Sequence, residues 1–236
     1  MKKALRTVLL IVLTGILLFS GYQVAVILRD SAKEKAAHED LVQQYKPQPQ
    51  TPEKDPLADL RAKYPDVLGW LTVPGTKVDH PFVQGKDNAQ YLRRDLDGAY
   101  AHGGTVFMEA RNSPDFTDFC TILYGHNMRN DTMFGTLERF EKQDFFDQNR
   151  SAEIILPERT LPLEVFACAV VDADDEEIYQ IDQADEAAKA AYLNALKAKS
   201  KCWRDPQITP DDRLVMLSTC SYAFDNARTI VVCKIK

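Results

Sequence analysis

The chain of 236 residues has five cysteines, yet it contains no CxxC pair and no spacing that suggests a disulfide framework. Without paired cysteines, a structural zinc site of the usual kind has no ligands. Cys120, Cys168 and Cys233 each lie in an apolar run, where free cysteine acts as a small hydrophobic residue. We therefore predict neither disulfides nor a zinc site.

Long basic segments, internal repeats and phosphate-binding glycine loops are also missing. The net charge is −6, from 29 basic and 35 acidic residues, and no basic block stands out beyond the N-terminus. Nucleic acid is therefore not an expected partner. The acidic run at 172–177 could supply oxygen ligands for calcium. A charged loop between a strand and a helix explains it as well, and we predict no metal and no cofactor.

Charge is absent from residues 7–28, a stretch rich in Leu, Ile and Val. As a helix these residues span roughly 33 Å, enough to cross a hydrocarbon core of about 30 Å. Lys2, Lys3 and Arg6 precede the stretch, so the positive-inside rule keeps the N-terminus in the cytoplasm and sends the rest outside. We predict a cytoplasmic tail at 1–6 and a transmembrane signal-anchor helix at 7–28. A cleaved export signal is the alternative, although its apolar core is usually shorter.

Residues 29–55 form a predicted stalk between the anchor and a catalytic domain at 56–236. The stalk is charged and helix-prone to about residue 46 and proline-rich at 46–52, which is typical of an extended spacer. The remaining residues, about 180, suffice for one domain with a substantial core.

Short apolar segments separated by Gly and Pro turns dominate this domain and indicate a β-barrel or rolled sheet with inserted helices. The clearest helix is expected at 183–199, where the first turn is acidic and the last is basic. Shorter helices are expected at 57–64 and, with a break, at 134–146, and one or two helical turns are expected at 88–94. Strands are expected at 70–73, 78–83, 104–108, 120–124, 153–156, 163–171, 213–219 and 229–235.

Cys220 differs from the cysteines of the apolar runs because polar residues surround it. It ends one apolar run and a loop follows, so we expect it at a strand end. A thiol in such a place needs a cationic neighbour to act as a nucleophile at neutral pH. Arg228 opens the next apolar run and cannot titrate, so its expected role is to donate hydrogen bonds to a substrate or an oxyanion. A buried core thiol is the alternative interpretation of Cys220.

His126 is the candidate base among four histidines. It follows an expected buried strand and could exchange a proton first with a thiol and then with a leaving amine. His102, in front of two glycines, is the rival candidate. His38 lies in the stalk and His80 precedes a proline, where a structural role is expected. Spacing along the chain does not choose between His126 and His102, because a catalytic Cys and His need only be close in the fold.

Together these segments resemble the motifs of sortases. Leu217–Cys220 and Arg228–Val232 are similar to the cysteine and arginine motifs of the family, and Tyr124–Met128 looks like its class B histidine motif. The resemblance covers about residues 56–236, and the order His, Cys, Arg also matches. Other similar segments are Gly69–Leu71, Gly75–Asp79, Asn88 with Tyr91–Arg93, and Thr132–Phe134.

The resemblance implies a mainly β fold with inserted helices. Its core is an eight-stranded sortase-type β-barrel, with an N-terminal helical extension and a helix between the sixth and seventh strands. The helix expected at 183–199 falls where that insertion belongs.

It also implies a sortase B-type cysteine transpeptidase without a cofactor. Cys220 attacks the threonine carbonyl of a C-terminal sorting signal of LPxTG or NPxTG type on a secreted protein, forming a thioester. His126 protonates the leaving amine, and Arg228 holds the substrate and stabilises the oxyanion. An amine of a cell-wall peptidoglycan precursor then resolves the thioester.

The family arrangement further implies a single-pass protein of the cell membrane, with the catalytic domain outside, in a Gram-positive bacterium. Asn127, Thr219, Ser221 and Tyr222 are candidate substrate contacts because they lie next to the motif residues. Asn127 could instead orient His126 or cap a turn.

Three rival functions remain open on the sequence. A cell-wall cysteine peptidase uses the same acyl-enzyme with water as acceptor. A pilin-polymerising sortase joins protein subunits to one another. A non-catalytic, membrane-tethered binding module would have all five cysteines in its core.

Overall fold

The structure is a computed structural model that describes residues 2–47, 55–183, 185–209 and 211–236. The chain forms two compact units, Met1–Gln43 and Gln44–Lys236. The proline-rich spacer predicted at 46–52 lies, from residue 48 onwards, outside the described residues.

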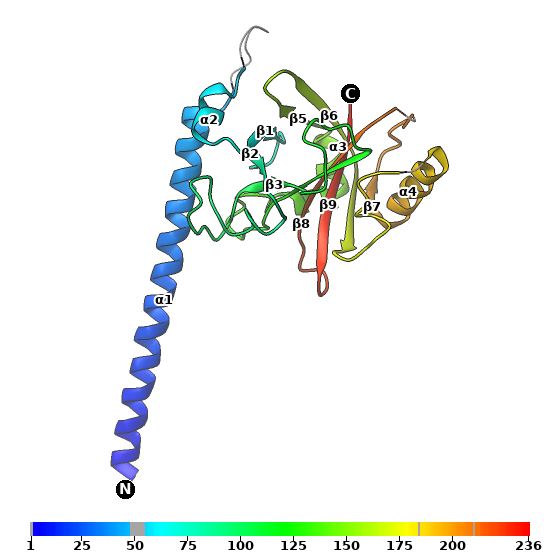
Figure 1. The fold of residues 1–236 in the computed structure, drawn as a ribbon. Coiled ribbons are helices and arrows are strands. Elements are labelled where there is room, and N and C mark those ends of the chain that lie inside the picture. Colours follow the sequence, from blue (N-terminus) through cyan, green and yellow to red (C-terminus); the bar gives the residue numbers. More distant parts are fainter. Residues whose placement is uncertain (1, 48–54, 184, 210) are drawn as a thin grey trace. The chain divides into compact units, whose positions relative to one another are not determined.

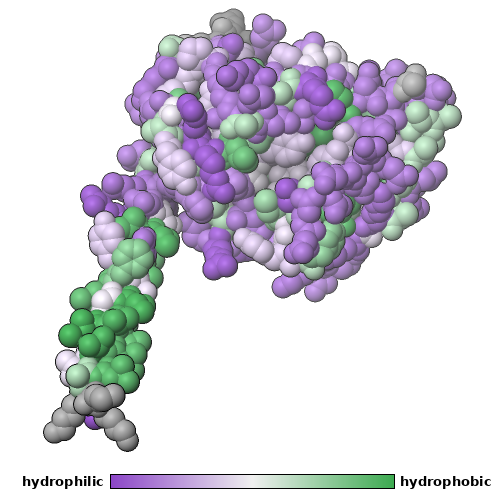
Figure 2. Space-filling view, turned by 60° about the horizontal axis from the view of Figure 1, so that its bottom comes forward, coloured by the Kyte–Doolittle hydropathy of each residue, from purple (hydrophilic) through white to green (hydrophobic). Residues whose placement is uncertain are grey.

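Helix α1 (Lys2–Tyr45) contains the predicted spanning segment and the helix-prone part of the stalk in one continuous element. Its 44 residues correspond to roughly 66 Å. Most of the large hydrophobic side chains between Leu5 and Leu28 are more than half exposed, and Figure 2 shows this part of the helix in green. Within the described part of the chain, α1 alone is long and apolar enough to cross a membrane, a property that it shares with signal sequences.

The second unit is built around a closed β-barrel (Figure 1). Neighbouring strands follow the order β5-β1-β2-β3-β4-β8-β9-β6-β7, and an additional pairing of β5 with β6 closes eight of these strands into a ring. The barrel predicted above is therefore confirmed. The strands are β1 (Val67–Thr72), β2 (Asp79–Gln84), β3 (Val106–Met108), β4 (Cys120–Tyr124), β5 (Ser151–Ile155), β6 (Thr160–Asp172), β7 (Ser200–Trp203), β8 (Leu214–Cys220) and β9 (Ala227–Ile235).

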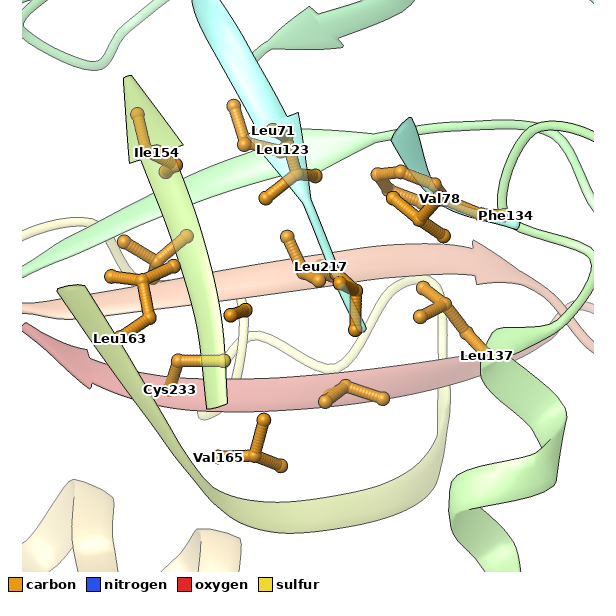
Figure 3. Close-up of a cluster of buried hydrophobic side chains, with 14 of the residues drawn as sticks. Leu71, Val78, Leu123, Phe134, Leu137, Ile154, Leu163, Val165, Leu217 and Cys233 are labelled. Carbon is orange, nitrogen blue, oxygen red and sulfur yellow. The ribbon is translucent and has the colours of Figure 1, made fainter. Parts of the chain in front are cut away.

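The barrel interior is filled by one cluster of apolar side chains to which all eight barrel strands contribute. On β8, Val215 and Leu217 belong to this interior cluster, whereas Leu214 and Met216 face outward, as the two-residue period of a strand requires. Figure 3 shows Leu217 among the interior side chains, with Leu123 nearby. This alternation decides which face of the barrel carries each residue at the strand ends.

A second apolar cluster, termed the outer cluster, covers the outside of β4, β6, β8 and β9. Ile122, Met216 and Ile230 contribute from the sheet, while Tyr192 and Leu196 contribute from helix α4 (Glu186–Lys199). The helix thus buries its apolar stripe against the barrel wall.

Helix α4 confirms the predicted helix between the sixth and seventh strands of the barrel. It begins three residues later than expected because Asp185 is its N-cap, with its carboxylate accepting a hydrogen bond from the Ala188 amide at 2.8 Å. Strand β7, which lies outside the ring and pairs with β6, follows α4 directly and was not expected from the sequence. Its four residues are too few to show an alternating pattern.

The helices predicted at 57–64 and 134–146 are present in shorter form. Helix α2 is Ala58–Lys63, and the second region divides into a 3₁₀ helix, η1 (Leu137–Glu141), and α3 (Gln143–Gln148). The break falls at Lys142, whose backbone is extended.

The helical turns predicted at 88–94 are present as single turns, in which the amides of Gln90, Leu92 and Arg94 each donate to the carbonyl three residues earlier, and no longer helix forms. The Asp87 carboxylate accepts hydrogen bonds from the amides of Ala89 and Gln90, at 3.0 and 2.8 Å. The Tyr91 carbonyl accepts from the Thr105 amide at 3.1 Å. The bonds to Asp87 cap the first turn, whereas the bond from Thr105 takes a carbonyl that a longer helix would use internally.

Candidate active site

The three predicted catalytic residues lie at neighbouring ends of β4, β8 and β9. Strands β4 and β8 are parallel with Tyr124 opposite Ser218, so His126 and Cys220, each two residues further on, leave the sheet at the same level. Strands β8 and β9 are antiparallel, and Cys220 is directly opposite Arg228. Strand register therefore brings together residues that are far apart in the sequence.

Cys220 and Arg228 project from the outer face of the barrel. Directly opposed residues of an antiparallel pair share a face. Two residues before Cys220 on β8, and on the same face, Ser218 lies opposite Ile230. Ile230 belongs to the outer cluster. Thr219 points to the other face and is 2% exposed. The site thus opens at the end of the outer cluster, and the barrel interior takes no part in it.

Among the five cysteines, Cys220 alone is partly exposed. The other four are at most 3% exposed. Burial raises the pKa of Cys120 and of Cys233 to about 12. It also raises the pKa of the thiols of Cys168 and Cys202. Since the thiolate is the reactive form of cysteine, these four thiols are chemically quiet. The hydrophobic role predicted for Cys120, Cys168 and Cys233 is confirmed.

His126 is half-buried, and its ring is held by a backbone carbonyl. Its Nε2 lies 2.7 Å from the Leu92 oxygen. A carbonyl only accepts, so Nε2 carries the proton and the neutral ring keeps the lone pair of Nδ1 free to take another. Burial lowers the pKa of His126 below its ordinary value. The Leu92 carbonyl opposes this shift, whereas the positive charges of Arg93 and Arg228 add to it.

Gly125 allows the chain to pass from β4 into His126. A Cβ atom on Gly125 would lie 2.7 Å from the ring of Phe134, which is fully buried. The Phe134 amide also donates a hydrogen bond to the His126 carbonyl at 3.0 Å. The aromatic ring fills the space that a larger residue would need, so close packing requires glycine here.

Arg228 keeps most of its hydrogen-bonding capacity unused. Its Nη1 donates to the Ala227 carbonyl at 3.0 Å, and no described carboxylate forms an ion pair with it. A guanidinium has five N–H donors, so the remaining ones are available for a carbonyl or an oxyanion.

Tyr179 was not expected from the sequence but borders the site. Its hydroxyl lies 2.8 Å from Ser218 Oγ, on the same face as Cys220. Burial raises the pKa of Tyr179 to about 12, and the charges of Arg228 and Cys220 also act on it. The tyrosine lies in the irregular connection between β6 and α4, where no periodic pattern marks it.

The acidic run at 172–177 holds this connection in place. Lys199 Nζ, at the end of α4, lies 2.7 Å from Asp175 and 2.8 Å from Glu177. Asn226 Nδ2, in the β8–β9 loop, donates to Asp172 at 2.9 Å and to Asp174 at 3.1 Å. The carboxylates thus fasten the connection that carries Tyr179 to both α4 and the loop preceding Arg228.

No hydrogen bond between Asn127 and the His126 ring is found among the described residues, so the idea that Asn127 orients this ring stays a prediction. Its Nδ2 donates to the backbone carbonyl of Cys220 at 2.9 Å and to Glu138 Oε1 at 2.7 Å. Glu138, on η1, was not expected from the sequence. The contact links the histidine motif to the main chain of the predicted nucleophile.

The remaining predicted substrate contacts lie around Cys220 in different environments. Ser221 is half-buried, and its amide donates to the Ala227 carbonyl at 2.9 Å. Tyr222 is 71% exposed on the β8–β9 loop. Both could touch a bound peptide, whereas Thr219 is buried and points to the opposite face.

The rival histidines lie elsewhere. His80 is 4% exposed within β2. His102 lies beside Arg93, whose Nη1 donates to its carbonyl at 2.6 Å. Because Arg93 and His102 both act on the pKa of His126, the two histidines are neighbours, but only His126 follows β4 into the register of Cys220.

The family model of the sortase domain matches residues 71–236, which include all three candidates. The chain belongs to the sortase family. Sortase B of Staphylococcus aureus is 30% identical over 238 residues, which cover 99% of the chain and 97% of that relative. This sortase is of class B, and sortases are cysteine transpeptidases.

Solved sortase structures share its fold. The crystal structure of sortase B from the type II pilus of Streptococcus pneumoniae is 41% identical, with a TM-score of 0.66 over 76% of this chain and 97% of that one. The Staphylococcus aureus sortase B–substrate complex is 28% identical, with a TM-score of 0.77 over 88% of this chain and 98% of that one.

Proposed function

We propose that this sortase is a membrane-anchored enzyme that cleaves a C-terminal sorting signal after its threonine and joins the new end to a cell-wall amine. Cys220 is the proposed nucleophile, with His126 as acid and base and Arg228 as the oxyanion and substrate donor. The observation that carries the proposal is the strand register, in which Cys220 faces Arg228 and lies level with His126.

In the proposed acylation step, the Cys220 thiol gives its proton to Nδ1 of His126, and the resulting thiolate attacks the threonine carbonyl so that a C–S bond forms. The carbonyl oxygen gains negative charge, and the N–H groups of Arg228 stabilise it. The peptide C–N bond then breaks, and His126 donates its proton to the leaving amine. A thioester remains on Cys220 once the amine has left.

In the second step, an acceptor amine attacks the thioester and gives a proton to His126. The C–S bond breaks, a new amide bond forms, and the Cys220 thiolate is restored. Water in place of the amine would yield hydrolysis, which is the outcome proposed by the peptidase alternative.

The neutral tautomer of His126 suits these roles. With Nε2–H donated to the Leu92 carbonyl, Nδ1 is the nitrogen that can receive and return a proton. Because the pKa of His126 is lowered, its protonated form becomes scarce at a lower pH than for an ordinary histidine. The proposed acid step should therefore weaken as the pH rises above that lowered pKa.

We propose that the N-terminus lies in the cytoplasm and the catalytic domain outside the cell membrane of a Gram-positive bacterium. The apolar part of α1 supports the single-pass anchor in this proposal. The proposed partners are secreted proteins with an LPxTG- or NPxTG-like signal and a peptidoglycan precursor amine. The existence of a substrate complex of Staphylococcus aureus sortase B supports a peptide substrate. Ser221 and Tyr222 remain proposed substrate contacts.

Assembly of pilin subunits is a second candidate. It is favoured by the 41% identity to the sortase B of a Streptococcus pneumoniae type II pilus. The two candidates differ only in the acceptor amine, which is a peptidoglycan peptide in one case and a lysine of a protein subunit in the other.

The test uses full-length protein in detergent with a panel of LPxTG- and NPxTG-like peptides. Each peptide is offered with no amine, with a cell-wall stem peptide, or with a lysine-containing pilin-type peptide, and products are separated and identified by mass. Cleavage after threonine and a new amide to the stem peptide would support wall anchoring, whereas joining only to the lysine peptide would support pilus assembly. Hydrolysis that no amine diverts would contradict transpeptidation. Cys220→Ala is the matched control.

A further inference from the structure

We infer that Asn127 is a positioning residue for Cys220 and that Glu138 fixes the orientation of its amide. The inference rests on the proposed role of Cys220 as nucleophile. In this inference Asn127 acts by holding the backbone of Cys220, and it does not need to contact the substrate.

The Asn127 side chain extends the β4–β8 ladder past the end of β4. The last backbone hydrogen bond that the β4 chain donates to β8 runs from the Gly125 amide to the Ser218 carbonyl, at 3.2 Å. In a parallel pair the next donor would come from residue 127 and reach the carbonyl of Cys220. There the main chain has turned away to bridge with Met133, and Asn127 Nδ2 supplies the bond instead, at 2.9 Å.

Glu138 determines which end of the amide faces Cys220. The two N–H groups of Nδ2 serve two acceptors, the Cys220 carbonyl and Glu138 Oε1 at 2.7 Å. A flipped amide would place its own oxygen against both of these oxygens. Glu138 is itself fixed because it lies on η1 between the buried residues Leu137 and Phe140.

The position of the thiol depends on this carbonyl because Cys220 is the last residue of β8. Beyond it, the Ser221 amide is held by the Ala227 carbonyl at 2.9 Å. Asn127 therefore secures the side of the Cys220 peptide group that β4 no longer supports. Loss of this bond would free the peptide to rotate, and a displacement of the reacting atom by about 1 Å can cost roughly a hundredfold in rate.

A positioning role and a substrate contact predict different kinetics. A positioning residue acts on the rate of acylation and leaves the affinity for the peptide nearly unchanged, whereas loss of a uniform substrate contact raises KM at constant kcat. A positioning residue should also affect modification of the thiol by a small reagent when no peptide is present.

The experiment compares Asn127→Ala, Glu138→Leu, Glu138→Gln and Asn130→Ala in the full-length protein. The glutamine of Glu138→Gln keeps an oxygen that accepts from Asn127, so this variant should retain the rate that Glu138→Leu loses. Asn130 lies on the same loop, and its side-chain oxygen accepts from Thr132 at 2.6 Å, so its alanine variant is the matched control. Thermal melts identify any variant that has not folded.

We expect Asn127→Ala to lower kcat for acylation by about ten- to a hundredfold with KM within about twofold. The kcat of Glu138→Leu should also be lowered, whereas Glu138→Gln should keep most of the wild-type kcat. The kcat of Asn130→Ala should stay within about twofold of the wild-type value. If Asn127→Ala does not fold, the two Glu138 variants decide the result.

Alkylation of Cys220 by iodoacetamide, followed in the same variants, separates the two hypotheses. If the wild type acylates no peptide, the proposed substrate is wrong, but slower alkylation in Asn127→Ala and Glu138→Leu than in Asn130→Ala still supports positioning. Equal alkylation in all variants, a raised KM at constant kcat, or a Glu138→Gln variant as slow as Glu138→Leu would overturn the inference.

Discussion

Selective alkylation of one thiol in five is the prediction that the structure determines most quantitatively. For Cys120 and Cys233, burial raises the pKa from 9.0 to about 12, which lowers the thiolate fraction by roughly a thousandfold at pH 8. The greater nucleophilicity of a high-pKa thiolate recovers about 15- to 30-fold. Chemistry alone therefore leaves these thiols about 30- to 60-fold slower than an exposed thiol of ordinary pKa.

Access adds to this difference. The four buried cysteines are at most 3% exposed, so each must wait for a local opening of the fold before the reagent can reach the sulfur. Cys220 is partly exposed and needs no such opening. We therefore expect Cys220 to be modified at least about a hundredfold faster than any other cysteine of the native protein.

The assay is a time course of iodoacetamide labelling at pH 8, with intact mass and peptide mapping. Native protein should take up one label, at Cys220, and Cys220→Ala should take up none in the same time. Denatured protein provides the control, because all five thiols should then react. Labelling of two or more native cysteines at similar rates would refute the reasoning, as would rapid labelling of Cys220→Ala.

Three further predictions concern the surroundings of the thiol. Arg228→Lys should lower acylation by about a hundredfold or more, because a point charge cannot replace the planar fork of donors; a peptide-cleavage assay at saturating substrate measures it. Gly125→Ala should lower the free energy of unfolding by about 1–3 kcal/mol, since its Cβ would meet the Phe134 ring, and urea melts would show no change if the packing were loose. Arg93→Gln should raise the pKa of His126 in an NMR titration, and an unchanged value would exclude this charge as a cause.

Local patterns in the sequence were sufficient for the barrel but not for all of its details. Long apolar strands such as β6 and β8 are evident, because most of their residues are buried. The segment at 88–94 forms the predicted turns but no longer helix, because the Tyr91 carbonyl also accepts a hydrogen bond from the Thr105 amide. Strand β7 was missed because its four residues carry no period.

The residues of the candidate site were likewise predicted only in part from the sequence. Cys220, His126 and Arg228 are conspicuous because each is a reactive or charged residue beside an apolar run. Tyr179, Glu138 and the Leu92 carbonyl are not, because they reach the site through tertiary contacts with Ser218, Asn127 and His126. Choosing His126 over His102 also required the register of β4 and β8, which no spacing along the chain contains.

The central claim is that Cys220 carries the acyl group, and intact mass of a rapidly quenched reaction tests it most directly. Full-length protein mixed with a cleavable sorting peptide should gain the mass of the fragment that ends in threonine, and peptide mapping should place it on Cys220. Added amine should release the fragment, and Cys220→Ala should never gain it. Peptide cleavage without any adduct, or an adduct on a different residue, would contradict the account.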